Sequence, residues 1–132
     1  MHTHLVFQNV NLIDLDADDG NPAGAKLAHL IADALPEHGF ATKSVVQEDW
    51  GWAIVIDNRA FPLWIGCGPD LEHESGHLCF IEPSRAQVRR WFKRVDTTDI
   101  IRRLGAALEA IVASEAATTG VRWWSEDEVR QR

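Results

Sequence analysis

Residues 49–68, DWGWAIVIDNRAFPLWIGCG, decide the fold. Large apolar side chains alternate along this stretch with small or polar ones, which is the pattern of strands that bury one face. They occupy even positions in the first half and odd positions in the second: Trp50, Trp52, Ile54 and Ile56, then Phe61, Leu63, Ile65 and Cys67. Residues 57–60 separate the two halves and contain an Asp and an Asn, which favour turns. The stretch therefore predicts a β-hairpin.

A turn centred on Asn58 and Arg59 sets the predicted register of this hairpin. The predicted pairs, from the turn outward, are Ile56 with Phe61, Ile54 with Leu63, Trp52 with Ile65 and Trp50 with Cys67. A slip of one residue would move the apolar set of one strand to the other face, so the pattern constrains the register. Trp64 is the one large residue that falls on the opposite face, where we expect it opposite Ala53.

The chain has 132 residues, so we predict a single α+β domain over residues 1–132. Residues 1–82 hold 3 basic and 13 acidic side chains, whereas residues 83–132 hold 10 basic and 7 acidic, within a net charge of −7. The acidic first part argues against nucleic acid or an anionic membrane as a partner of the whole protein.

The start of the chain lacks a basic segment followed by an apolar run, and no apolar run reaches the length of a membrane span. Cys67 and Cys79 fall inside predicted strands. Without a secretion signal, reduced thiols in a cytoplasm are the default. We therefore expect a cytoplasmic protein that binds neither nucleic acid nor membrane.

Turn and cap signals place the other elements. Asn21 and Pro22 begin a predicted helix that Gly39 ends, and Asp96 with Thr97 caps another that runs to about residue 117. Further strands are predicted near residues 4–8, 41–48, 77–82 and 121–124. The order favours an α+β fold. Its antiparallel sheet has about four to five strands built on the central hairpin, with two long helices and one short basic helix packed mainly on one face.

The short basic helix is predicted over residues 84–95. Ser84 and Gln87 stand at the spacing of a capping box, and Val88, Trp91, Phe92 and Val95 share one helical face. This face predicts that both aromatic rings are buried. The remaining faces carry the basic side chains Arg85, Arg89, Arg90, Lys93 and Arg94, which would form a solvated surface able to contact an acidic partner.

The segment His73-Glu74-Ser75-Gly76-His77 matches HExxH and over these five residues resembles zinc metallopeptidases. On a helix the two histidines would hold zinc and the glutamate would act as a general base. Pro69 precedes the motif, Gly76 lies within it and a strand-like run follows. We therefore predict that His73 and His77 lie in a loop or turn and bind no structural metal, and we keep a zinc-dependent hydrolase as the alternative.

Two further groups of residues have both a chemical and a structural interpretation. Cys67 could form a nucleophile pair with a nearby histidine, but its position on the core face predicts a buried apolar role. Glu48 and Asp49 could serve acid–base chemistry or bind a cation. Adjacent strand residues point to opposite faces, which favours a turn or an anchor for a Trp ring nitrogen.

We expect a non-enzymatic protein-interaction module, with no catalytic residue and no cofactor. Small acidic single-domain proteins of this kind resemble bacterial toxin-neutralising immunity proteins, which implies an immunity-like or inhibitor role. The expected partner is another protein or a second copy. The candidate partner-binding residues are Trp64, Val55, Pro62, Glu48, Asp49, Arg89 and Arg90. A small-ligand site at Trp64 is a further alternative.

The Trp64 ring has three possible surroundings. The N-terminal segment or C-terminal strand of the same chain could cover it, a second copy could cover it, or the ring could be open. An open ring flanked by Val55 and Pro62 would mark a partner surface, because monomers seldom expose large contiguous apolar patches.

Overall fold

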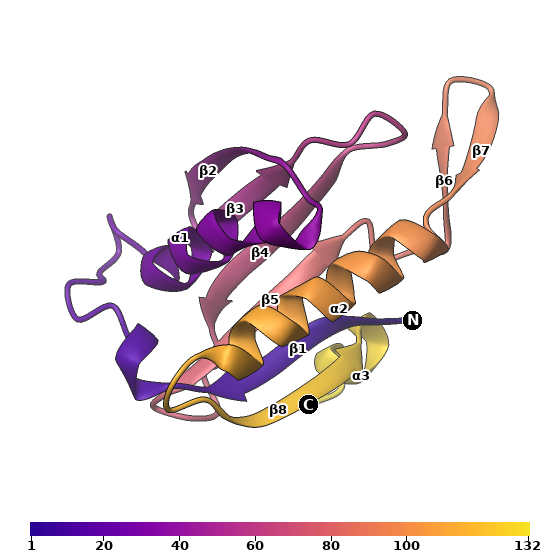
Figure 1. The fold of residues 1–132 in the computed structure, drawn as a ribbon. Coiled ribbons are helices and arrows are strands. Elements are labelled where there is room, and N and C mark those ends of the chain that lie inside the picture. The colour runs from indigo at the N-terminus through magenta and orange to yellow at the C-terminus, as the bar shows by residue number, and fades with distance from the viewer.

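Six strands form one antiparallel sheet in the computed structural model, which describes residues 1–132 (Figure 1). The strands are β1 (His2–Gln8), β2 (Thr42–Glu48), β3 (Gly51–Ile56), β4 (Leu63–Pro69), β5 (Gly76–Glu82) and β8 (Thr119–Ser125). Their order across the sheet is β2-β3-β4-β5-β1-β8. The predicted α+β class is confirmed, but the sheet has six strands rather than four or five.

Two helices pack on one face of this sheet and enclose the core. They are α1 (Ala25–Ala34) and α2 (Thr98–Ser114), and short 3₁₀ turns lie at Val10–Leu12 and Leu35–His38. The prediction of two long helices is wrong for the first, which has ten residues and changes to a 3₁₀ turn where Pro36 removes a backbone donor. A continuous apolar cluster joins them to the sheet, with Leu5, Leu27, Ile31, Ile54, Ile65, Leu104 and Leu108 fully buried. The other face of the sheet receives no long helix (Figure 1).

The β3–β4 hairpin buries the predicted face in a register two residues from the predicted one. Ile54 pairs with Ile65 and Ile56 pairs with Leu63. The connection is longer than a two-residue turn because Asn58 Nδ2 donates to the Phe61 carbonyl at 2.9 Å and closes a wider loop. A shift of two residues keeps the side chains within the strands on their faces. The residues buried as predicted are Ile54, Ile56, Phe61, Leu63, Ile65 and Cys67.

Trp50 lies on the face opposite to the predicted one. It belongs to the turn between β2 and β3, where the strand alternation has not yet begun, and its ring contacts Trp64 and Phe80. Trp52 keeps the predicted core face, and its indole Nε1 donates to the Pro22 carbonyl at 2.9 Å.

The predicted basic helix is wrong. Residues 87–96 form a separate hairpin of β6 (Gln87–Arg90) and β7 (Lys93–Asp96), joined by the two-residue turn Trp91-Phe92. The seven-residue spacing from Val88 to Val95 fits two helical turns, but it also pairs these residues across a tight hairpin. Valine favours the strand, and Trp91 and Phe92 in the turn are exposed. The predicted burial of Trp91 and Phe92 is therefore wrong as well.

Asp14, rather than Asn21, caps α1. Its carboxylate accepts hydrogen bonds from the backbone N–H of Gly24 at 2.7 Å and of Lys26 at 3.1 Å. Asp14→Ala is therefore expected to lower the free energy of unfolding by about 1 kcal/mol in a urea melt. The exposed Asp16 of the same loop provides the control, and Asp16→Ala should change stability by less than about 0.5 kcal/mol. Equal losses from the two variants would rule out this cap.

The C-terminal residues end in the short helix α3 (Glu126–Arg130), with a capping box between Ser125 and Glu128. This helix contacts β1 and β8. Ser84 Oγ also donates to its Glu126 carboxylate at 3.0 Å. Glu126 lies close enough to affect the pKa of His4. His4 precedes the core residue Leu5 on β1, so its side chain points to the sheet face away from α2. The helix thus covers only the β1–β8 end of the second sheet face.

Candidate functional site

Three aromatic rings gather on the sheet face that α1 and α2 do not cover. The ring centroids of Trp50, Trp64 and Phe80 lie 6.0 Å (Trp50–Trp64), 5.2 Å (Trp50–Phe80) and 5.6 Å (Trp64–Phe80) apart. Apolar side chains extend this cluster over the surface. We call the whole set the aromatic face, and it comprises Trp50, Trp64, Phe80, Val46, Val55, Leu71 and Leu78. Trp50 is 43% exposed and Leu71 is 90% exposed, so the face is open to solvent.

A glycine opposite Phe80 allows its ring to lie against the sheet. Gly66 pairs with Phe80 across β4 and β5, and a Cβ on Gly66 would stand 2.2 Å from the Phe80 ring. On its other side Phe80 stacks on the His4 ring, with centroids 5.6 Å apart. Burial lowers the pKa of His4, which favours the neutral form of its ring. The Phe80 ring of the aromatic cluster therefore packs on the sheet at Gly66 and against the His4 ring.

Trp64 is central to the aromatic face because it lines three neighbouring depressions. The largest has a volume of about 540 Å³, and its other lining residues include Pro62, Glu82, Val88, Arg89, Arg90 and Trp91. The second is lined by Trp50, Leu71, Leu78 and Phe80, and the third by Val46, Glu48, Ala53 and Val55. One half-buried ring thus lies between the sheet surface and a depression that extends along β6 to Trp91.

The structure brings most of the candidate partner-binding residues together. Val55, Pro62, Glu48, Arg89 and Arg90 each line a depression that Trp64 also lines. Asp49 lies in the neighbouring β2–β3 turn and lines none of the three.

The direct surroundings of Trp64 differ from those predicted. Its strand neighbour is Val55 rather than Ala53. The N-terminal and C-terminal strands β1 and β8 lie in the sheet itself and do not cover it.

Sequence reasoning did not identify Phe80, Leu78 or Leu71 as part of this surface. Phe80 and Leu78 share a parity in the predicted strand over residues 77–82, which was a usable signal that they lie on one face of it, but not that this face adjoins Trp64. Leu71 lies in a turn, where no periodicity indicates its direction.

Charged groups of opposite sign border the aromatic face. Glu48 and Asp49 lie at the β2–β3 end, while Arg89 and Arg90 lie on the β6–β7 hairpin. Glu82 stands between Trp64 and that hairpin, and burial raises the pKa of its carboxyl, with a further contribution from Glu126. Folding raises the pKa of the Glu82 carboxyl. The contribution of Glu82 to the free energy of unfolding therefore falls as the pH rises through this pKa.

The HExxH segment does not form a helix. His73 is exposed in the turn before β5, as predicted, but His77 lies within β5 and is buried, so the prediction of a loop for His77 is wrong. The ring of His77 stacks on Phe7, and its Nε2 lies 2.8 Å from the Asn9 carbonyl oxygen. The two histidines therefore do not share the helical face that the metallopeptidase arrangement requires.

Cys67 and Cys79 are buried in the core, as predicted for Cys67. They pair across β4 and β5, and their Sγ atoms lie 3.9 Å apart. The hydrogen bond with Cys67 and the burial of the site raise the pKa of the Cys79 thiol well above its usual range. A protonated, enclosed thiol is a poor nucleophile.

Comparisons of the chain with family models, with curated proteins and with solved structures give no match. No helix of the fold combines the length and apolar composition that crossing a bilayer requires. Likewise, no group of three or more His, Cys, Asp or Glu side chains is placed to hold a metal ion.

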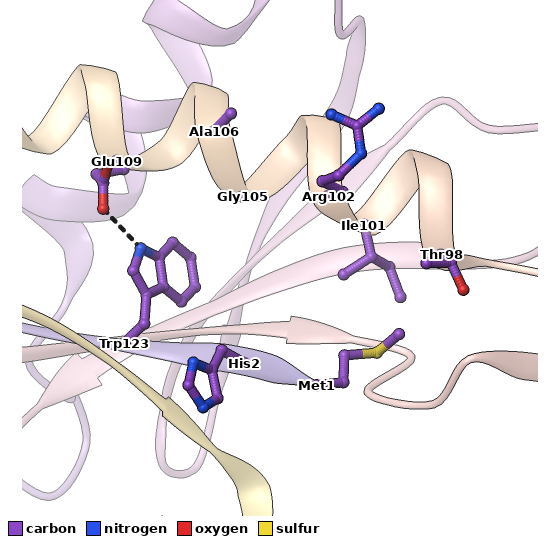
Figure 2. Close-up of a pocket in the computed structure, with 9 residues that line it drawn as sticks. All are labelled: Met1, His2, Thr98, Ile101, Arg102, Gly105, Ala106, Glu109 and Trp123. Carbon is purple, nitrogen blue, oxygen red and sulfur yellow. Dashed lines mark hydrogen bonds between the residues drawn. The ribbon is translucent and has the colours of Figure 1, made fainter.

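A second groove lies on the other side of the molecule, between α2 and the β1–β8 end of the sheet. Figure 2 shows the indole of Trp123 directed at α2, where its Nε1 donates to the Glu109 carboxylate at 2.8 Å. His2 lies beside it, with its Nε2 3.2 Å from Glu128. Both polar groups already have partners within the chain, so this groove presents no convergent set of free functional groups.

A third group ties the C-terminal end to the β4–β5 turn. Arg132 Nη2 lies 3.0 Å from Asp70 Oδ1 and 2.7 Å from Glu72 Oε2. These contacts raise the pKa of the Arg132 guanidinium. The guanidinium carbons of Arg122 and Arg132 lie 3.7 Å and 5.3 Å from the centroid of the Trp124 ring. The arrangement is an internal ion-pair and cation–π network that fastens α3.

Proposed function

We propose that this chain is a cytoplasmic protein-interaction module, of an immunity-like or inhibitor kind, that binds a partner protein through the aromatic face. The observation that carries this proposal is the three-ring cluster of Trp50, Trp64 and Phe80 on a sheet face that no long helix covers. Exposed contiguous apolar surface of this type marks interaction sites.

The composition of the aromatic face suits a binding surface. Aromatic side chains dominate the energetics of many interfaces, and truncating such an anchor costs about 2 kcal/mol or more. Trp64 is half-buried by Trp50 and Phe80, so its ring is already held in place. A preorganised anchor loses little conformational entropy on binding, which favours affinity.

The charged residues at the borders of the aromatic face indicate which charges the partner would carry. Glu48 and Asp49 would face basic groups of the partner, whereas Arg89 and Arg90 would face acidic ones. Complementary charge of this kind selects partners and speeds association more than it adds affinity. The proposed partner therefore presents an apolar centre between a basic and an acidic border.

Replacing Trp64 tests this proposal. Trp64→Ala is expected to leave the chain folded and to weaken association with the partner, or with a second copy, about 30-fold or more. Association is measured by titration of the purified partner and by light scattering of the protein alone. Trp123→Ala is the matched control, because this half-buried ring lies on the α2 side of the sheet. Equal affinity of wild type and Trp64→Ala would contradict the proposal.

A further inference from the structure

The β6–β7 hairpin projects from the body of the protein as a short arm (Figure 1). We call residues 85–96 the basic arm. Its base is fixed, because the backbone N–H of Thr97 donates to the Ala86 carbonyl at 2.9 Å and the Thr97 hydroxyl donates to the Arg85 carbonyl. Val88 and Val95 pack against the core cluster. The arm is therefore a supported element and not a loose loop.

Two aromatic residues form the tip of the arm. Trp91 is 84% exposed and Phe92 is 102% exposed, which makes them the most exposed aromatic side chains of the chain. Trp91 has a φ of 60°, a left-handed conformation that a bulky residue rarely adopts. Such backbone strain tends to occur at ligand-binding sites. A turn that presents two apolar rings to solvent contributes nothing to the core.

Basic side chains surround this tip on both faces of the arm. Arg90 pairs with Lys93 next to the turn, and Arg89 pairs with Arg94 one step further. Successive strand residues point to opposite faces, so one pair lies on each face. None of these four cations has a salt bridge within the chain. Like charges directly opposite each other are unfavourable, so an external anionic surface would relieve them.

We propose that the basic arm docks the protein on an anionic lipid bilayer, with Trp91 and Phe92 at the interface and the four cations among the headgroups. Aromatic rings favour the membrane–water interface. Each Lys or Arg near an anionic leaflet raises the partition coefficient about fivefold, and a collar around an apolar tip combines both contributions. The arm would bind the surface peripherally and would not span the membrane.

The length of the arm lets this contact coexist with an acidic body. Residues 85–96 carry five basic and one acidic side chain, a charge of +4, so the rest of the chain carries −11 within the total of −7. Val88 packs on the core cluster, and the three strand steps from Val88 to Trp91 extend about 10 Å. The Debye length in physiological salt is about 8 Å. At the tip, repulsion from the acidic body is therefore reduced by screening.

A nucleic acid fits this arm less well. A hairpin that reads a groove inserts its strands about 8 Å deep, so the acidic body would come within one Debye length of the phosphates. The cations also lie on both faces rather than along one stacking groove, which is the arrangement that single-stranded nucleic acid requires. The expectation of no membrane partner came from the charge of the whole chain, whereas residues 85–96 carry a local charge of +4.

Vesicle co-sedimentation tests the proposal. The wild-type chain is expected to pellet with vesicles that contain phosphatidylglycerol, not with pure phosphatidylcholine vesicles, and to be released by high salt. The double variant Trp91→Ser/Phe92→Ser should lower the partition coefficient at least about tenfold, because both interfacial rings are lost. Leu15→Ser, at an equally exposed apolar residue in the loop before α1, should keep it. Trp64→Ala should also keep vesicle binding, which separates this proposal from that for the aromatic face.

The substitutions at Trp91 and Phe92 could disturb the hairpin itself, so a second double variant leaves the turn residues unchanged. Arg89→Gln/Arg94→Gln retains the turn and should lower the partition coefficient about 25-fold, as expected for two lost cations at about fivefold each. Melting curves check that each variant is folded. The proposal is overturned if the wild type does not bind anionic vesicles at moderate salt, or if both double variants bind them as the wild type does. Salt-sensitive binding to oligonucleotides or to an acidic polypeptide without vesicle binding would also overturn it.

Discussion

Ile54→Ala is expected to lower the free energy of unfolding by about 2–5 kcal/mol. Ile54 is fully buried, pairs with Ile65 across the β3–β4 hairpin and belongs to the core cluster. Removal of its branched side chain leaves a cavity between the sheet and the helices, and a close-packed interior fills such a cavity only in part. A urea melt gives the value directly.

Val55→Ala provides the control, because Val55 is the next residue on the same strand and faces the other way. It is half-buried on the aromatic face, so its truncation should cost about 1 kcal/mol or less. A loss under 1 kcal/mol for Ile54→Ala, or a larger loss for Val55→Ala, would mean that the two faces have been assigned the wrong way round.

Gly24→Ala is expected to lower the free energy of unfolding by about 2–5 kcal/mol. Two effects contribute: the left-handed backbone conformation, and the steric clash of the added Cβ. Gly24 has a φ of 119°, which an L-residue rarely adopts, and a Cβ there would stand 2.5 Å from the Cys67 carbonyl oxygen. The obstructing atom belongs to the backbone of a central strand, so the neighbour cannot rotate away. Gly51, the first residue of β3, approaches the same carbonyl, which leaves that oxygen little room to move.

Gly39→Ala separates the two effects. Gly39 has a φ of 90°, but a Cβ there would meet no atom within 4 Å. Its substitution should therefore cost only the conformational term of about 1–2 kcal/mol. Equal losses at Gly24 and Gly39 in urea melts would show that α1 does not pack as closely on β4 as described.

The burial pattern of the central hairpin could be predicted from sequence because side-chain direction repeats every two residues. Ile54 and Leu63 are buried as predicted, although the pairing is shifted by two residues. The loop length could not be predicted, since it depends on the bond from Asn58 to the Phe61 carbonyl. Trp50 was misplaced for a related reason: alternation applies within a strand and not in the turn before it.

The basic arm shows where sequence periodicity is ambiguous. The positions of Val88, Trp91, Phe92 and Val95 satisfy a helical stripe, and the same spacing satisfies a hairpin with a two-residue turn. Tertiary contacts at Thr97 and at the two valines decide between them, and the sequence does not display these contacts. The cap of α1 by Asp14 was missed similarly, because the carboxylate comes from ten residues before Gly24.

For the candidate site, the sequence identified Trp64 as the exception to the hairpin pattern, and the structure adds its neighbours. Phe80 reaches Trp64 from an adjacent strand, and Trp50 reaches it from a turn. Such convergence depends on strand order, which local patterns do not specify. The aromatic face is thus a property of the sheet and not of any single segment.

Hydroxyl-radical footprinting of the protein, alone and in its complex with the partner or a second copy, tests the central claim most directly. Binding through the aromatic face should protect the side chains of Trp50, Trp64 and Leu71, which are open or half-open in the free chain. Met1 and Trp123 of the groove in Figure 2 should remain as reactive as before. Unchanged oxidation at Trp64 with protection of Met1 and Trp123 would contradict the claim and assign the interface to the opposite side of the sheet.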